Sequence, residues 1–269
     1  MVSIIEKSYT VESETLDSIF AHWRQTDSFL RWNCLFVLPV WLKPWWDNFG
    51  GNAALYLLSI RHEGRIIGIA PLQRSDTTAR LIGDENVCDN LDFIVAPETS
   101  AEFYRTLLDH LKQDGIKRLE LEPVRQDSSV MAQLLPMAEK TDCRISSEGH
   151  DMSYELALPD SWDDYLTLLS AKERHEIRRK LRRLYEAGPI SYRLVEDVSS
   201  AKKDVETFLE LFRSNRADKA EFMNDQMASF FKGLTEALEE ARILKLFFLN
   251  LDESTVSATM CFDYRSTMY

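Results

Sequence analysis

The sequence is poor in the residue patterns that build metal centres and disulfide frameworks. Its four cysteines lie far apart, and none belongs to a C-x-x-C or paired Cys/His motif, so we expect neither a zinc site nor a set of disulfides. The five histidines form no cluster. We therefore expect no metal, and we expect the cysteines to be small buried residues, with a nucleophilic Cys34 or Cys88 as the alternative.

Apolar segments that target or anchor a protein in a membrane are also missing. The N-terminus, MVSIIEKSYTVESETL, has neither the basic region nor the apolar core of a signal peptide. No run approaches the roughly 18 apolar residues that cross a bilayer. These absences predict a reduced, cytoplasmic protein without a transmembrane segment.

The chain also lacks an excess of basic residues over acidic ones. The chain has 32 Lys and Arg against 44 Asp and Glu, a net charge of −12. General nucleic-acid binding is therefore not expected, because it needs a basic surface. What the chain does have is 45% hydrophobic residues in a length of 269, enough for one large domain or two of ordinary size.

One stretch, residues 161–188, runs against the acidic balance. Ser161 is a helix-start residue, and Gly188 before Pro189 is a stop signal, so we predict a helix between them. Residues 172–183 hold seven basic and two acidic side chains, +5, which leaves −17 for the rest of the chain. The basic residues are Lys172, Arg174, Arg178, Arg179, Lys180, Arg182 and Arg183.

Two interpretations of this basic stretch stay open. Arg174, Arg178 and Arg182 are spaced i, i+4, i+8 and should share one helical face. Guanidinium groups match phosphate and carboxylate geometry, so the face is a candidate site for an anionic ligand. A solvated helix face paired with acidic neighbours is the structural alternative.

The order of expected elements predicts an α+β fold with mostly antiparallel sheets. Residues 1–158 read as strand, two helices, three strands, helix, strand, helix, strand, with the first strand at 2–9 and the last at 153–158. The pattern starts again at 159, and its later hairpin echoes the earlier one. We therefore expect two repeats, 1–158 and 159–269, and a fragment whose second repeat is incomplete at its C-terminus.

The chemistry-bearing candidates outside the basic helix are aromatic and acidic. Trp41 and Trp45 lie at helical spacing after Pro39, either in a core helix or on the aromatic wall of a ligand cleft. Asp89 and Asp92, in a polar loop, are candidate general bases, as is Asp263 on the last strand. The alternative for the loop residues is turn capping.

Several motifs in order resemble the CelD/BcsL-type acyltransferases of the GNAT superfamily, which are relatives of the Fem-type peptidoglycan aminoacyltransferases. The resemblance covers nearly the whole chain, and five motifs together make it moderately specific. The motifs of the first half are Trp41, Trp45–Trp46, Phe49–Gly50, Gly64, Gly68–Leu72, Leu81–Gly83, Asp89 and Leu91–Phe93. Those of the second half are Trp162–Leu166, Ser170, Lys172, Arg174, Ile177–Arg179 and Gly188.

The resemblance implies two GNAT-like repeats that face a central cleft. It implies acyl transfer from acetyl-coenzyme A or another acyl-coenzyme A to a sugar, polysaccharide or cell-envelope precursor, by direct attack of the acceptor on the thioester. In Fem-type relatives a basic residue of the matching helix contacts phosphates of a nucleotide-linked precursor, and here Arg174 or Arg178 is the counterpart. The expected substrate-binding residues are Trp41, Trp45, Lys172, Arg174, Arg178 and Arg182.

The sequence departs from the family at the donor site. GNAT proteins hold the coenzyme A pyrophosphate on a Gly-rich loop at a helix N-terminus. The matching residues 93–101, FIVAPETSA, have no glycine and include Glu98, and the second equivalent would lie beyond Tyr269. We therefore expect the fragment to be inactive. A Fem-type transferase that uses aminoacyl-tRNA and a non-catalytic module that binds an anionic partner remain alternatives.

Overall fold

The computed structural model describes residues 9–25, 29–141, 143–149, 152–195 and 197–269. The predicted strand at 2–9 therefore lies almost wholly outside the described residues. The elements of the first half are β1 (Tyr9–Ser13), α1 (Leu16–Trp23), η1 (Leu35–Val37), α2 (Pro39–Phe49), β2 (Ala54–His62), β3 (Arg65–Ser75), β4 (Thr78–Leu81), β5 (Ile94–Val95), η2 (Pro97–Thr99), α3 (Ser100–Gln113), β6 (Arg118–Glu120), η3 (Val130–Leu134) and α4 (Leu135–Ala138).

The first sheet has the order β1-β2-β3-β4-β6, and β5 also pairs with β3. All its pairings are antiparallel except that of β4 with β6. The hairpin between β2 and β3 turns at Glu63 and Gly64, whose φ angles of 50° and 77° are those of a type I′ turn. The expected α+β class with a mostly antiparallel sheet is therefore confirmed.

β4 and β5 are two pieces of one interrupted strand. β3 pairs with β4 near Leu72 and with β5 near Gly68, so both pieces run along the same edge of β3. Residues 82–93 leave the sheet between them. Helix α3 then packs closely on the sheet, because a Cβ on Gly68 would lie 2.3 Å from Cδ2 of Phe103.

The second half repeats the order of the first. Its elements are α5 (Trp162–Leu168), α6 (Ala171–Ala187), β7 (Ile190–Leu194), α7 (Val198–Asn215), α8 (Ala217–Phe222), α9 (Asp225–Glu240), β8 (Leu244–Leu251), β9 (Ser254–Tyr264) and β10 (Thr267–Met268). Strand β7, helices α7 and α9, and strands β8, β9 and β10 follow one another as β1, α1, α2, β2, β3 and β4 do. The sheet order β10-β9-β8-β7 matches as well. This match supports a structural duplication.

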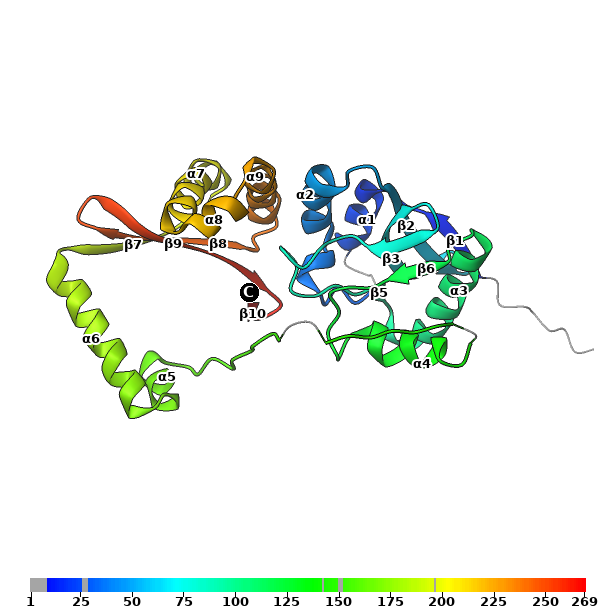
Figure 1. Cartoon of the computed structure of the whole chain (residues 1–269), viewed down its shortest axis with the longest axis horizontal. Helices are drawn as coiled ribbons and strands as arrows, with labels where there is room; N and C mark the ends of the chain where they lie inside the picture. Colours follow the sequence, from blue (N-terminus) through cyan, green and yellow to red (C-terminus); the bar gives the residue numbers. More distant parts are fainter. Residues whose placement is uncertain (1–8, 26–28, 142, 150–151, 196) are drawn as a thin grey trace, which may run out of the picture.

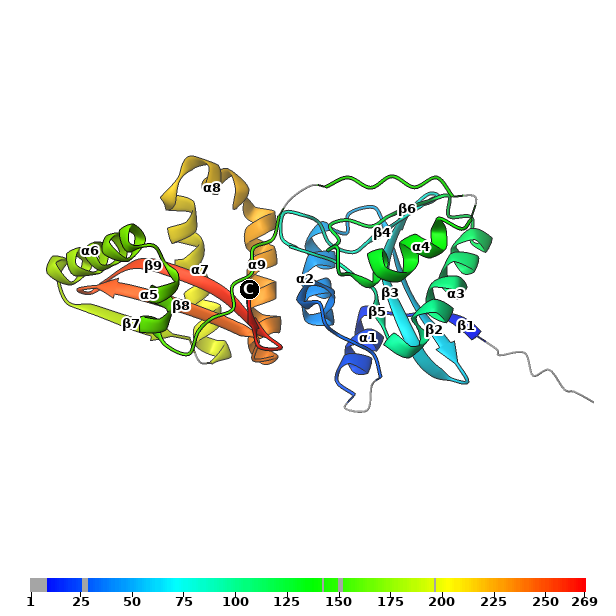
Figure 2. The same cartoon turned by 90° about the horizontal axis from the view of Figure 1, so that it is seen from below.

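The two halves meet through equivalent helices, because α2 packs against α9 (Figures 1 and 2). The ring of Phe230 on α9 lies 6.1 Å from that of Trp41 and 5.4 Å from that of Phe49. The Tyr264 hydroxyl also donates a hydrogen bond of 2.6 Å to the Trp32 carbonyl, which links the two halves by a polar contact. One continuous core therefore runs through both halves.

The structure corrects two expectations around the basic stretch. Residues 161–188 form two helices instead of one, because Ser170 restarts the chain as the N-cap of α6. Residues 153–158 are not a strand: they run as an extended, unpaired segment in which Tyr154 is 86% exposed. Two residues with extended backbone angles, Leu169 and Ser170, separate α5 from α6.

Candidate functional site

Helices α5 and α6 form an arm (Figure 1), and its second helix carries the basic stretch of residues 172–183. The Ser161 hydroxyl accepts from the amide of Asp164 at 3.1 Å and begins α5. At the start of α6 the Ser170 hydroxyl accepts from the Glu173 amide at 3.3 Å, and the Glu173 carboxylate accepts from the Ser170 amide at 2.8 Å. Hydrogen bonds from Ser170 lower the pKa of Glu173. This capping box fixes where α6 begins.

Arg174 joins the two helices of the arm. Its Nη1 donates to the carbonyl oxygens of Leu169 and Leu166, which lie at the C-terminal end of α5. A cation at a helix C-terminus also offsets the negative end of the helix dipole. The structure therefore gives Arg174 a positioning role within the arm.

The remaining cations of α6 divide into paired and unpaired ones. Glu176 accepts from Arg179 at 2.9 and 2.6 Å and lies 3.8 Å from Nζ of Lys180. The hydrogen bond from Arg179 lowers the pKa of Glu176. Arg182 has a loose partner, Glu186, at 3.7 Å. Within the described residues, Lys172, Arg178 and Arg183 have no carboxylate within 4.0 Å.

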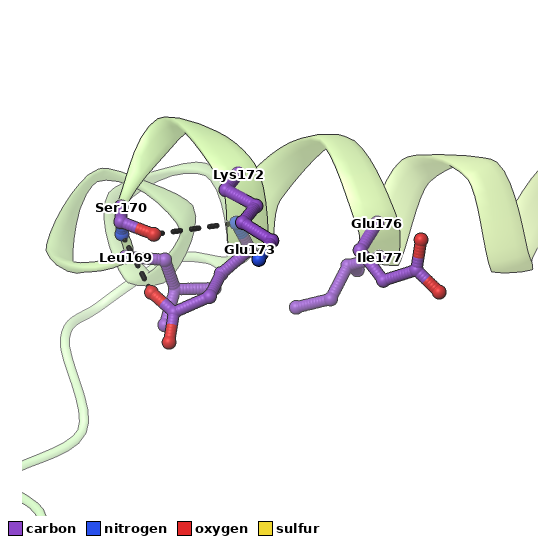
Figure 3. Close-up of a pocket in the computed structure, with 6 residues that line it drawn as sticks. All are labelled: Leu169, Ser170, Lys172, Glu173, Glu176 and Ile177. Atoms are coloured by element: carbon purple, nitrogen blue, oxygen red, sulfur yellow. Dashed lines mark hydrogen bonds between the residues drawn. The ribbon is translucent and has the colours of Figure 1, made fainter.

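The hollow at the α5–α6 junction lies on the acidic side of α6 (Figure 3). It has a volume of about 460 Å³ and is lined by Leu169, Ser170, Lys172, Glu173, Glu176 and Ile177. An anion placed there would meet two carboxylates and one ammonium group. Arg178 and Arg182 lie four residues apart on the other side of the helix and make the more favourable face for an anion.

The structure places both candidate tryptophans in the core, which corrects their expected role in substrate binding. Trp41 is 2% exposed and Trp45 is 4% exposed. The Trp41 ring meets Phe36 and Phe262 edge to face, at 4.9 and 5.2 Å. The alternative of a core helix therefore holds, since neither indole is open to a ligand.

Asp92 is held by the chain on both carboxylate oxygens. Its Oδ1 accepts from the Phe93 amide at 2.9 Å and the Ser129 hydroxyl at 2.7 Å, and its Oδ2 accepts from the Ser129 amide at 2.8 Å. Burial raises the pKa of Asp92 more than these hydrogen bonds lower it. No sequence pattern indicates that Asp92 and Ser129 are partners, because 37 residues separate them. Asp89 and Asp263 are exposed.

The two buried cysteines are unsuited to nucleophilic catalysis. Burial raises the pKa of Cys34 and of Cys88 to about 12 in each case. The Cys34 thiol donates to the Asn90 carbonyl at 3.3 Å. Because the thiolate is the reactive form, both side chains are structural.

The described residues do not fit the pyrophosphate of an acyl-coenzyme A donor. The β5–α3 junction has the expected topological position, but Pro97 has no amide hydrogen there, and Glu98 and Glu102 bring negative charge to it. Negative charge repels the phosphates that a helix N-terminus would otherwise attract. In the second half, the described residues place no helix after β9. The described residues therefore supply no phosphate-binding loop for such a donor.

Comparisons with known proteins point to one family. Residues 171–269 match the acetyltransferase (GNAT) domain family, whose members in general take the acyl group from an acyl-coenzyme A. The expected resemblance is thereby confirmed for the second half. No curated protein matches the sequence.

Among solved structures, the crystal structure of FemX is similar, with a TM-score of 0.55 and 17% identity. The match covers 90% of this chain and 58% of that one, so the chain spans a little over half the length of FemX. At this identity the likeness concerns the fold, which in FemX consists of two GNAT-like domains.

The described residues contain neither a candidate metal centre nor a membrane-spanning helix. No group of three or more His, Cys, Asp or Glu side chains is arranged to hold a metal ion there. Among the same residues, every helix is too short or too polar to span a membrane.

Proposed function

We propose that this chain, which carries a GNAT acetyltransferase domain over residues 171–269, belongs to an acyltransferase whose acceptor bears a phosphate or carboxylate held on α6. The acceptor class is a sugar, polysaccharide or cell-envelope precursor, in free, nucleotide-linked or lipid-linked form. The observation that carries the proposal is the weakly paired cationic face of α6, formed by Arg178 and Arg182, on a chain whose net charge is −12.

Arg178 and Arg182 are the proposed ligands of the anionic group. Lys172 would attract the anion electrostatically over a longer distance. Arg178 has no carboxylate partner among the described residues, and Arg182 has only Glu186 at 3.7 Å. A planar guanidinium can donate two parallel hydrogen bonds to a phosphate or carboxylate. Arg174 would act indirectly, because its hydrogen bond to α5 holds the cationic face of α6 in position.

Two exposed tyrosines favour an acceptor that has a sugar or a nucleobase next to its anionic group. Tyr185 lies three residues after Arg182 on α6, and its ring is 60% exposed. A hydrogen bond with Tyr185 raises the pKa of Tyr192 on β7, whose ring is 69% exposed. Exposed phenol rings offer an apolar face with a polar edge, which suits stacking against a sugar or a base.

The proposed chemistry is direct attack of an acceptor nitrogen or oxygen on the acyl carbonyl of a thioester: the new amide or ester bond forms, the carbon–sulfur bond breaks, and the donor leaves as a thiol that takes up the proton lost by the acceptor. Such a reaction needs positioning and proton removal but no protein nucleophile. Asp89 and Asp263 are the proposed bases because they are exposed. Asp92 is a weaker candidate because three hydrogen bonds engage its carboxylate.

The acceptor site can be tested by calorimetric titration with UDP-N-acetylglucosamine. The variant with Arg178→Glu and Arg182→Glu should bind about tenfold more weakly or worse, because each charge-assisted hydrogen bond contributes about 1.5–3 kcal/mol. The matched control is Lys112→Glu with Lys117→Glu, which reverses two exposed cations of the first half. Equal affinity in both double variants would contradict the assignment.

A second candidate is transfer of an aminoacyl group from tRNA. It is favoured by the FemX-like fold and by the acidic β5–α3 junction, which suits no coenzyme A pyrophosphate. Titrations with acetyl-coenzyme A and with a charged tRNA separate the two. Binding of acetyl-coenzyme A supports the first candidate, and binding of the tRNA alone supports the second.

A further inference from the structure

Residues 153–158, which we call the inter-half linker, lead from the first half to α5 and are open along their whole length (Figure 1). All six residues are exposed, and Tyr154, Leu156 and Leu158 are 86%, 57% and 73% exposed. The linker belongs to no helix or strand, and within the described chain none of its amides or carbonyls takes part in a backbone hydrogen bond. Another molecule can therefore bind this backbone without any prior local unfolding.

An ion pair holds the linker against the first half. Arg125 bonds both to Glu155 on the linker and to Asp127. The side chains of Arg125 and Glu155 are 36% and 64% exposed. Exposed ion pairs contribute little to stability, because water screens the charges and two long side chains must be ordered. This contact therefore places the linker without closing it to a binding partner.

The contact between the two halves, by contrast, does not involve the linker. Phe230 on α9 is fully buried, and its ring lies 6.1 Å from that of Trp41 on α2. The Trp41 ring also meets Phe262 on β9 at 5.2 Å, and Nε2 of Gln226 donates to the Asn48 carbonyl at 2.6 Å. A buried aromatic centre with polar bonds at its edge is typical of a stable interface between proteins. The halves are thus joined by side-chain packing as well as by the chain itself.

We propose that the inter-half linker is a cleavage site for an endopeptidase that accepts a large apolar side chain before the scissile bond, and that the halves stay associated after the cut. The two scissile bonds are Tyr154–Glu155 and Leu156–Ala157. Leu158 is not a site, because the nitrogen that follows it belongs to the ring of Pro159. Water adds across the peptide bond, so that the carbon–nitrogen bond breaks and leaves a carboxylate and an amine. The proposal does not depend on the proposed enzymatic function.

The free backbone distinguishes the linker from other exposed aromatic positions. Peptides that bind in an extended form pair through their own amides and carbonyls. Tyr192 is 69% exposed but lies in β7, which is paired with β8, and Tyr185 is 60% exposed but lies within α6. The ring of Phe29 is covered on one face by the Arg65 guanidinium, at 4.1 Å. A protease must disturb existing contacts at these three positions but not at Tyr154.

The test is limited digestion of the native chain by chymotrypsin, whose primary pocket is a hydrophobic slot, with the fragments identified by mass spectrometry. The first cuts should follow Tyr154 or Leu156. The variant with Tyr154→Ser and Leu156→Ser should be cut between the halves at least about tenfold more slowly, because the pocket loses its apolar side chain. The control Tyr192→Ser removes an equally large exposed ring from paired backbone and should be cut at the wild-type rate.

Size-exclusion chromatography of the digest tests the second part of the proposal. Without denaturant, the two fragments should elute together at the volume of the uncut chain, and they should separate in urea. Three results would overturn the proposal. The first is an initial cut outside the linker, and the second is a native chain that resists protease at levels that digest the urea-unfolded chain. The third is a pair of fragments that elute apart without denaturant.

Discussion

Glu14, at the junction of β1 and α1, is a carboxylate enclosed by donors and positive charge. Its side chain is 6% exposed, and it accepts from Ser18, from Ser59 at 2.7 Å and from Arg61 at 3.1 Å, with His22 at 3.6 Å. Burial raises its pKa, but the two serine hydrogen bonds and the charges of His22 and Arg61 outweigh burial. The net pKa lies below the ordinary 4.5.

This arrangement predicts a specific acid sensitivity. Because the folded-state pKa of Glu14 lies below the unfolded value near 4.5, the unfolded chain binds more protons as the pH falls through that range. The free energy of unfolding should therefore fall below about pH 4.5, and Glu14→Gln should remove part of that fall. Urea unfolding between neutral pH and about pH 3 measures it.

The control for this measurement is Glu98→Gln, at an exposed position at the start of η2. Its acid slope should match that of wild type. The same slope in Glu14→Gln as in wild type would show that Glu14 does not couple folding to pH.

The interaction partners of a side chain were harder to predict than its position on a helix or loop. The spacing of Arg174, Arg178 and Arg182 correctly indicates neighbouring positions on a helix, but it treats the three as equivalent. Arg174 differs because the helix is interrupted at Leu169. This interruption leaves carbonyl oxygens within hydrogen-bonding distance of the Arg174 guanidinium group. Asp92 was likewise predicted as a candidate base, but in the folded chain Ser129 donates hydrogen bonds to its carboxylate. Partners that distant segments supply cannot be read from local spacing.

At the scale of elements, the contact between β3 and α3 depends on one missing side chain. An added Cβ at Gly68 would lie 2.3 Å from Cδ2 of Phe103, which is fully buried. Gly68→Ala should therefore lower the free energy of unfolding by about 1–3 kcal/mol through overpacking. Gly149→Ala is the control, because a Cβ there meets nothing within 4 Å. Denaturation midpoints that coincide for the two variants would contradict this packing account.

The capping box of α6 gives a second prediction at this scale. Ser170→Ala should cost about 1 kcal/mol of local helix stability, because the Glu173 amide loses its acceptor. The arm has little packing against the body, so global unfolding should barely change. Hydrogen exchange should speed up in α6 and stay the same in α9. Unchanged exchange in α6 would contradict the cap assignment.

Elements with strong periodicity and clear end signals were predicted well. The two hairpins that the order of elements predicted are present, β2 with β3 in the first half and β8 with β9 in the second. The motif Ser170-x-x-Glu173 was a capping-box signal that could have located the break between α5 and α6. The strand expected at 153–158 has the right alternation, but no neighbour pairs with it.

At the scale of the whole molecule, the contact of α2 with α9 holds the halves together. Phe230 is fully buried and touches rings of both halves. Phe230→Ala should cost about 3–5 kcal/mol, because the transfer and cavity terms add. Phe29→Ala, at a position 56% exposed, should cost much less. Thermal unfolding of the two variants with equal midpoints would show that this contact is not a main source of stability.

The most direct test of the account is an NMR titration that observes the arginine guanidinium groups as UDP-N-acetylglucosamine is added. We expect shifts at Arg178 and Arg182, with Arg174 little changed because it stays bound to the end of α5. Shifts confined to arginines of the first half, or none at saturating ligand, would contradict the assignment of α6 as the site of the anionic acceptor.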